Sequence, residues 1–228
     1  MLTQKIIGLD LDNTIVCYDR AIEALAEGFL RIPKSLPKTK THIRDYLRDA
    51  GRESDWTRFQ GELYGPGMIH AELFDHVIDV LNELENLGHE IRVISHRTRF
   101  PYLGERHDLH QFACTWISAR IPKISAQVTF HEAKAEKVNA IAEAACDFFL
   151  DDLPQILTDS RFPASTIGIL FSPQGENSEW SGVGRLTFPD GSTYEGEWAR
   201  GFMNGKGTFT WSDGTQKSGN WINGKLQE

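Results

Sequence analysis

The stretch Ile6-Ile7-Gly8-Leu9-Asp10-Leu11-Asp12-Asn13-Thr14 decides how the N-terminal part of this chain folds. Its apolar first half predicts a buried β-strand, and two carboxylates follow where that strand ends. Residues two apart in an extended strand lie on the same face, so Asp10 and Asp12 are expected side by side. Two anions at such close range are costly unless a cation or a shared proton compensates them. The stretch therefore predicts a metal-assisted centre with one nucleophilic carboxylate and one acid–base carboxylate.

The composition narrows the class of protein. The 228 residues have a formal net charge of −8 and no sustained basic block, which argues against nucleic acid as the main partner. No apolar run approaches the ~20 residues of a membrane span, and the N-terminus carries no signal-peptide pattern. Cys17, Cys114 and Cys146 are odd in number and far apart, so we expect buried, reduced thiols. These features predict a cytoplasmic protein with one sizeable core and an accessory module.

Strand and helix patterns alternate up to residue 171. After residues 5–10, strands are predicted over 90–95, 125–130, 147–151 and 165–170. Helices are predicted over 19–31, 40–50, 53–63, 72–87, 106–120 and 132–145, with a short one after Pro154. This alternation predicts a Rossmann-like α/β core, in which a mainly parallel sheet has helices on both faces. Ligands bind such sheets at the carboxyl ends of the strands, where Asp10, Ser95 and Asp151-Asp152 are expected.

The residues at those strand ends are suited to phosphoryl transfer. A carboxylate can accept the phosphoryl group, and a second carboxylate can carry a proton. The Ser95 hydroxyl and a lysine that opens a helix, either Lys134 or Lys137, can neutralise the transferring oxygens together with a hard cation. Oxygen-only ligands favour Mg²⁺ over zinc.

The order of these residues resembles the haloacid dehalogenase-like (HAD) superfamily over about residues 1–171. The first motif of that family, Asp-x-Asp-x-Thr, corresponds to Asp10-Leu-Asp12-Asn-Thr14. The resemblance implies that Asp10 forms an aspartyl-phosphate, and that Asp12 protonates the leaving group and then activates water. It also implies that the backbone carbonyl of Asp12 binds Mg²⁺ and that Thr14 lies on the substrate side. The implied activity is hydrolysis of a small phosphorylated metabolite; a nucleotide and a sugar phosphate both fit.

The remaining motifs follow in the same order. Ser95 resembles the second motif, whose Thr or Ser hydrogen-bonds the phosphoryl group. For the third motif we prefer Lys134, because Lys-Ala-Glu-Lys-Val resembles the helix-opening lysine of the family, and Lys137 is the alternative. Asp151 and Asp152 resemble the acidic fourth motif. The metal ligands implied by the resemblance are Asp10, Asp12, Asp151 and Asp152.

The 82 residues from 13 to 94 exceed what a strand–helix–strand crossover needs. In the family such an insertion, here about 20–72, resembles a small helical cap that closes over the site and favours small substrates. The segment 31–52 contains seven Lys or Arg residues and only two acids. These basic residues either steer an anionic substrate or form a solvated helix face. His96 and Arg97 follow Ser95 and are candidates for binding a substrate carboxylate or second phosphate.

The composition changes after Phe171. Residues 172–180 are expected to form a linker, and 181–228 repeat themselves at an offset of 23, which pairs Gly182 with Gly205 and Trp198 with Trp221. Alternating aromatic and polar residues around Asp-Gly turns predict β-hairpins. Residues 194–201, Tyr-Glu-Gly-Glu-Trp-Ala-Arg-Gly, resemble the MORN repeat. We expect this tail to pack on the body, on a second copy of the chain or on a protein partner. The competing hypothesis is a non-catalytic HAD-fold interaction protein whose tail is the functional end.

Overall fold

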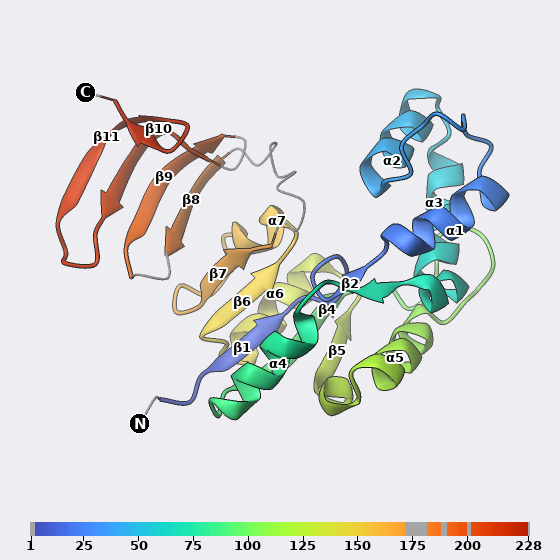
Figure 1. The fold of residues 1–228 in the computed structure, drawn as a ribbon, viewed down its shortest axis with the longest axis horizontal. Helices are drawn as coiled ribbons and strands as arrows, with labels where there is room; N and C mark the ends of the chain where they lie inside the picture. Colours follow the sequence, from blue (N-terminus) through green and yellow to red (C-terminus); the bar gives the residue numbers. More distant parts are fainter. Residues whose placement is uncertain (1–2, 172–181, 188–190, 200–201, 228) are drawn as a thin grey trace.

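The computed structural model describes residues 3–171, 182–187, 191–199 and 202–227. Its core is a five-stranded sheet of order β5-β4-β1-β6-β7 (Figure 1). Every neighbouring pair in this sheet is parallel. The strands are β1 (Ile6–Leu9), β4 (Glu90–His96), β5 (Val128–His131), β6 (Phe148–Asp151) and β7 (Ile167–Leu170). The predicted α/β architecture is confirmed.

Helices cover both faces of the sheet. They are α4 (Val77–Asn86), α5 (Leu109–Arg120), α6 (Lys134–Glu143) and α7 (Pro154–Leu157). Val93 and Ile94 are adjacent on β4 and point to opposite faces. Val93 packs in a cluster with Leu81 of α4 and residues of α5, whereas Ile94 packs with Ile141 of α6 and with α7. The core therefore has three layers. Within the described residues, no helix combines the length and apolar character that a bilayer crossing requires.

A group of helices lies beyond the carboxyl end of β1 (Figure 1). It consists of α1 (Asp19–Phe29), α2 (Lys40–Asp49), α3 (Glu53–Tyr64) and the 3₁₀ helix η1 (Pro66–His70). The Thr39 hydroxyl accepts a hydrogen bond from the His42 amide at 3.3 Å, so α2 begins with a capped first turn. Buried apolar residues at helical spacing pack α2 and α3 against each other: Ile43, Leu47, Trp56, Phe59 and Leu63.

Three predicted elements begin three or more residues later than expected. The helix expected over 106–120 begins at Leu109. The helix expected over 72–87 begins only at Val77, because 72–73 form strand β3 (Glu72–Leu73) and pair with β2 (Val16–Cys17). The strand expected over 125–130 begins at Val128, after the 3₁₀ helix η2 (Pro122–Gln127). The expectation of buried thiols holds only for Cys146, since Cys17 is half-buried and Cys114 is exposed.

The tail forms a second sheet, which is antiparallel with order β12-β11-β10-β9-β8. Its strands are β8 (Gly182–Thr187), β9 (Thr193–Ala199), β10 (Phe202–Thr210), β11 (Gln216–Ile222) and β12 (Lys225–Leu226). The first of them, β8, lies next to β7 of the core sheet (Figure 1). Hairpins are therefore confirmed for the tail, while the predicted linker 172–180 lies outside the described residues.

Four glycines of the tail face one another across four strands. Gly184 pairs with Gly196, Gly196 with Gly207, and Gly207 with Gly219. We call these four residues the glycine row. A Cβ added to Gly207 would lie 2.1 Å from the Tyr194 hydroxyl oxygen, so Tyr194 occupies space that a side chain would fill. The row thus lets the Tyr194 ring lie on the sheet, where it packs with Trp198 and Trp221 in the small tail core.

Candidate active site

Three buried side chains meet where β1 and β6 end. The Asp10 amide donates to the Leu150 carbonyl at 2.8 Å, so the chain after β1 runs beside the end of β6 and brings Asp10 close to Asp151. Lys137 of α6 extends between them. Its Nζ lies 2.5 Å from Asp10 Oδ1 and 2.7 Å from Asp151 Oδ2. One buried ammonium is therefore shared by two buried carboxylates.

Asp152 adds a third carboxylate to this cluster. One oxygen from each of Asp10, Asp151 and Asp152 lies within 4.8 Å of the others. If all three acids were ionised, they would outnumber the single buried lysine, so full ionisation of the cluster requires a further cation. Hard carboxylate oxygens are the ligands that Mg²⁺ prefers. The residues present therefore fit a divalent cation.

The pKa values of these groups reflect burial and mutual charge. Burial raises the pKa of Asp10 well above its ordinary value; Lys137 opposes this shift and the neighbouring carboxylates add to it. Burial also raises the pKa of Asp152 to about 6. Burial by itself would lower the pKa of Lys137, but Asp10 and Asp151 outweigh it and the pKa is raised. Lys137 is thus held as a cation, while the raised pKa values of Asp10 and Asp152 show that these two acids resist ionisation without a further cation.

The structure corrects the preference for Lys134. Lys134 is the first residue of α6 and is exposed, whereas Lys137, one turn further along, is fully buried between the carboxylates. The alternative weighed from the sequence, Lys137, is the lysine that reaches Asp10.

Two buried hydroxyls lie in the segments that carry the first two motifs. Ser95 is within β4, and Thr14 is in the turn after β1, where Asn13 adopts a left-handed conformation with φ 63°. Neither Ser95 Oγ nor Thr14 Oγ1 has a hydrogen-bond partner among the described residues. Buried polar atoms are rarely left unpaired. Both hydroxyls are therefore available to a ligand oxygen.

Asp12 is tied to Arg97 and Tyr18 instead of to the Lys137 cluster. Arg97 Nε donates to Asp12 Oδ2 at 3.1 Å and Nη2 donates to Asp12 Oδ1 at 2.5 Å. The Tyr18 hydroxyl donates to Asp12 Oδ1 at 2.6 Å and accepts from Arg97 Nη2 at 2.7 Å. Burial raises the pKa of Tyr18 well above its ordinary value, so it remains a hydroxyl. The two motif carboxylates therefore have separate environments.

The helix group beyond β1 contributes Lys40, the first residue of α2. Its Nζ lies 5.9 Å from the centroid of the Tyr64 ring, which in turn meets the Tyr18 ring edge-on at 5.0 Å. Burial alone would lower the pKa of Lys40, but Tyr64 and Asp152 outweigh it and the pKa is raised. Four other basic residues of this helix group pair with acids: Lys38 with Glu27, Arg44 with Asp45, Arg48 with Glu53, and Arg52 with Asp55. Lys40 instead interacts electrostatically with Asp152 of the carboxylate cluster.

His96 ends β4 and is half-buried beside this cluster. Burial, with a smaller contribution from Lys137, lowers its pKa below the ordinary value. A neutral imidazole is therefore favoured at neutral pH.

The sequence did not identify three residues of the site. Tyr18 and Tyr64 were not selected, and Lys40 was only one of seven basic residues in its segment. A signal for Tyr18 existed, because it follows the short apolar run 15–17, which comes directly after the first motif. For Tyr64 the sequence offered no signal beyond its place near the end of an expected helix.

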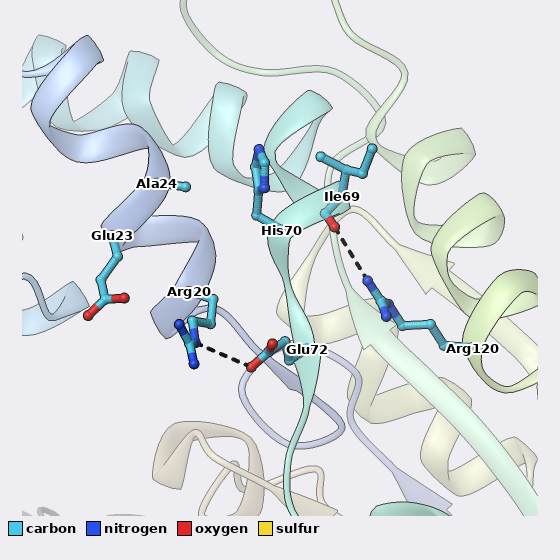
Figure 2. A pocket seen from close by; sticks show the side chains of 7 residues that line it. All are labelled: Arg20, Glu23, Ala24, Ile69, His70, Glu72 and Arg120. Atoms are coloured by element: carbon cyan, nitrogen blue, oxygen red, sulfur yellow. Dashed lines mark hydrogen bonds and ion pairs between the residues drawn. The ribbon is translucent and has the colours of Figure 1, made fainter.

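A separate open pocket of about 510 Å³ lies on another part of the surface (Figure 2). Both of its arginines are already engaged: Arg20 lies 3.7 Å from Glu72, and Arg120 donates to the Ile69 carbonyl at 3.3 Å. The lining residues are Arg20, Glu23, Ala24, Ile69, His70, Glu72 and Arg120, and they do not include the carboxylate cluster. This pocket is distinct from the candidate active site.

Comparisons with known proteins find similarities to both parts of the chain. The profile of the MORN repeat matches residues 176–193 and 194–216, which confirms the repeat expected in the tail. No curated protein matches the chain significantly.

Several solved structures are similar to part of this chain at low identity, each with a TM-score under 0.5. They include protein tyrosine kinase A of Mycobacterium tuberculosis, at 16% identity and a TM-score of 0.47, covering 72% of this chain and 83% of that one. A haloacid dehalogenase-like hydrolase of Streptococcus pneumoniae has 13% identity and a TM-score of 0.44, covering 74% and 85%. A protein described as a predicted phosphatase of Clostridium acetobutylicum has 17% identity and a TM-score of 0.42, covering 72% and 84%.

Proposed function

We propose that this chain is a Mg²⁺-dependent phosphomonoester hydrolase of the HAD type that acts through an aspartyl-phosphate. The observation that carries the proposal is the placement of Lys137 Nζ within 2.7 Å of both Asp10 and Asp151. A carboxylate that is buried, oriented by an ammonium and adjacent to further acids has the surroundings of a nucleophile that works with a cation. The two unpaired hydroxyls, Ser95 and Thr14, supply donors for phosphoryl oxygens.

In the proposed reaction the Asp10 carboxylate attacks phosphorus, and the bond from phosphorus to the ester oxygen breaks. Asp12 gives the leaving oxygen a proton. Asp12 then takes a proton from water, whose oxygen attacks phosphorus, and the phosphate leaves with Asp10 regenerated. Lys137 holds Asp10 in place throughout. Mg²⁺ would be held by Asp10, Asp151, Asp152 and the Asp12 carbonyl, and when bound it neutralises charge on the transferring oxygens.

For the substrate we propose a small phosphorylated metabolite bound between the cap, about residues 20–72, and the core, about 1–171 without the cap. Lys40 supports this proposal, because it places a cap cation near the acidic cluster. His96 is proposed to contact the substrate as a neutral donor or acceptor. The Arg97 nitrogens are already engaged with protein groups, which favours another role for that residue.

The test is hydrolysis of p-nitrophenyl phosphate by the wild type and by Asp10→Asn, each with Mg²⁺ and with a chelator. We expect activity only in the wild type with Mg²⁺. Equal activity in both proteins would contradict the enzyme proposal. A panel of nucleotide and sugar phosphates under the same conditions then identifies the preferred ester.

For the tail, about 181–228, we propose association with a second copy of the chain or with a protein partner. Phe202, Trp211 and Ile222 are large apolar side chains that this sheet leaves exposed. The experiment is to compare the solution mass of the full chain with that of a chain lacking 176–228. An unchanged monomer in both cases, with no partner retained by the full chain, would contradict the proposal.

A further inference from the structure

We propose that Arg97 is a positioning residue, which fixes the Asp12 carboxylate and ties it to the base of the cap. This inference rests on the proposed function, because it concerns how Asp12 serves phosphoryl transfer. It assigns Arg97 a role different from the substrate binding that its place after Ser95 suggests.

The hydrogen bonds of Arg97 carry the proposal. Arginine has a rigid fork of five N–H donors. In this chain Nε and Nη2 bind the two oxygens of Asp12, and Nη2 also donates to the Tyr18 hydroxyl. Nη1 donates to the Tyr64 carbonyl at 3.3 Å and to the Leu109 carbonyl at 3.1 Å. Every guanidinium nitrogen is therefore engaged, and a substrate anion could bind Arg97 only by displacing one of these groups.

Burial makes this arrangement rigid. The Arg97 side chain is only 3% exposed, and the Asp12 side chain is 16% exposed. A two-pronged contact between a guanidinium and a carboxylate allows one relative orientation, which a lysine cannot reproduce. The Asp12 carboxylate is consequently held in a single position relative to the chain that carries Asp10.

The partners of Arg97 come from segments that are distant in the sequence. Asp12 follows β1, Tyr18 immediately precedes α1, Tyr64 ends α3 and Leu109 begins α5. The guanidinium also lies 5.3 Å from the centroid of the Tyr64 ring. Arg97 therefore connects the proposed acid–base group to both ends of the cap helices. A displacement of α3 would consequently shift Arg97 and, with it, the Asp12 carboxylate.

A double-mutant cycle of Arg97→Lys and Asp12→Asn tests the proposal. The quantity is kcat/KM, with Mg²⁺ present, for p-nitrophenyl phosphate and for a simple alkyl phosphate. Loss of a positioned acid lowers kcat/KM more for the alkyl ester than for the aryl ester, because an alkoxide is a poor leaving group and needs the proton. We expect Arg97→Lys to lower kcat/KM for the alkyl ester by roughly 10²-fold and for the aryl ester much less. In the Asp12→Asn background it should change either value by no more than about twofold, since it acts through Asp12.

The matched control is Arg161→Lys. Arg161 makes a similar two-pronged contact with Asp159, through Nε at 2.8 Å and Nη2 at 2.6 Å, on the exposed surface. This substitution should leave both kcat/KM values unchanged. If Arg97→Lys does not fold, Tyr18→Phe replaces it in the same cycle, because it removes the hydroxyl shared by Asp12 and Arg97; the same pattern with a smaller loss is expected.

Equal losses on the two esters, or losses that multiply with those of Asp12→Asn, would overturn the positioning role. The failure of the proposed function looks different. In that case the wild type does not hydrolyse either ester, or Asp10→Asn is as active as the wild type. If hydrolysis depends on Asp10 but the losses from Arg97→Lys and Asp12→Asn multiply, the positioning role is refuted and the proposed function stands.

Discussion

Lys137 Nζ and Asp10 Oδ1 are 2.5 Å apart in a region closed to solvent. Because Lys137 also contacts Asp151, its removal would leave two buried carboxylates without their cation. Breaking a buried ion pair by removing one partner costs about 3–5 kcal/mol. We expect Lys137→Met to lower the free energy of unfolding by about this amount when Mg²⁺ is absent, as measured by urea denaturation, and to abolish hydrolysis.

Lys134→Met is the matched control, since Lys134 is an exposed lysine on the same helix. Its effect on unfolding should stay within about 0.5 kcal/mol. Comparable losses in the two variants would show that Lys137 is not paired as described.

Mg²⁺ is expected to stabilise the protein in a pH-dependent manner. The folded-state pKa of Asp152 is about 6, above its ordinary value of 3.8. Without metal, the contribution of this group to stability is therefore present below about pH 4 and is lost as the pH rises through about 6. Mg²⁺ binds the ionised carboxylates, so the rise in Tm on adding Mg²⁺ should be larger at about pH 7.5 than at about pH 5.

At a Mg²⁺ concentration 100 times Kd, binding contributes about 2.7 kcal/mol, which corresponds to roughly 5–10 °C in Tm. Calorimetry with and without a chelator measures this rise, and Asp152→Asn should reduce it at the higher pH. A larger rise at the lower pH would contradict a carboxylate site.

Lys40 is expected to act in substrate binding more than in the chemical step. A charge-assisted hydrogen bond contributes about 1.5–3 kcal/mol, so Lys40→Gln should raise KM for an anionic ester about tenfold or more. The value of kcat should change little. Lys34→Gln, at an exposed cap lysine, is the control and should have no effect. Steady-state kinetics separate these outcomes; a fall in kcat at constant KM would place Lys40 in the chemistry.

The glycine row predicts a graded response to added methyl groups. Gly207→Ala would bring a Cβ to 2.1 Å from the Tyr194 hydroxyl oxygen, whereas Gly219→Ala would meet the tip of Leu226, which can move. We expect Gly207→Ala to disrupt the tail core, seen as a loss of near-UV circular dichroism from its tryptophans, and Gly219→Ala to do so much less. Hydrolysis of p-nitrophenyl phosphate should persist in both, because the carboxylate and lysine side chains of the Asp10 site all come from the core and none from the tail sheet.

The sequence predicted the layered core well, because apolar strand patterns such as 5–10 and 90–95 alternate with helical patterns such as 132–145. It favoured Lys134 over Lys137, and the structure reverses that preference. Both lie on the helix face of Ile141, so the choice depends on how far α6 is shifted along the sheet, about 4.5 Å for three residues. That shift is set by tertiary packing.

The antiparallel pairing of β2 with β3 was missed for a related reason, since strands of two residues have no measurable period. The Arg97–Asp12 contact was also inaccessible, because it joins residues 85 apart. The sequence placed both near strand ends but could not show that Arg97 turns toward Asp12.

The glycine row also sets the scale on which the tail can grow. Each 23-residue unit adds two strands, and neighbouring strands are about 4.8 Å apart, so one more repeat lengthens the sheet by about 10 Å. The row itself would extend by two glycines with each unit and keep the same register. The length of the tail sheet is thus set by the number of repeats, and it can change without altering the residues of the Asp10 site.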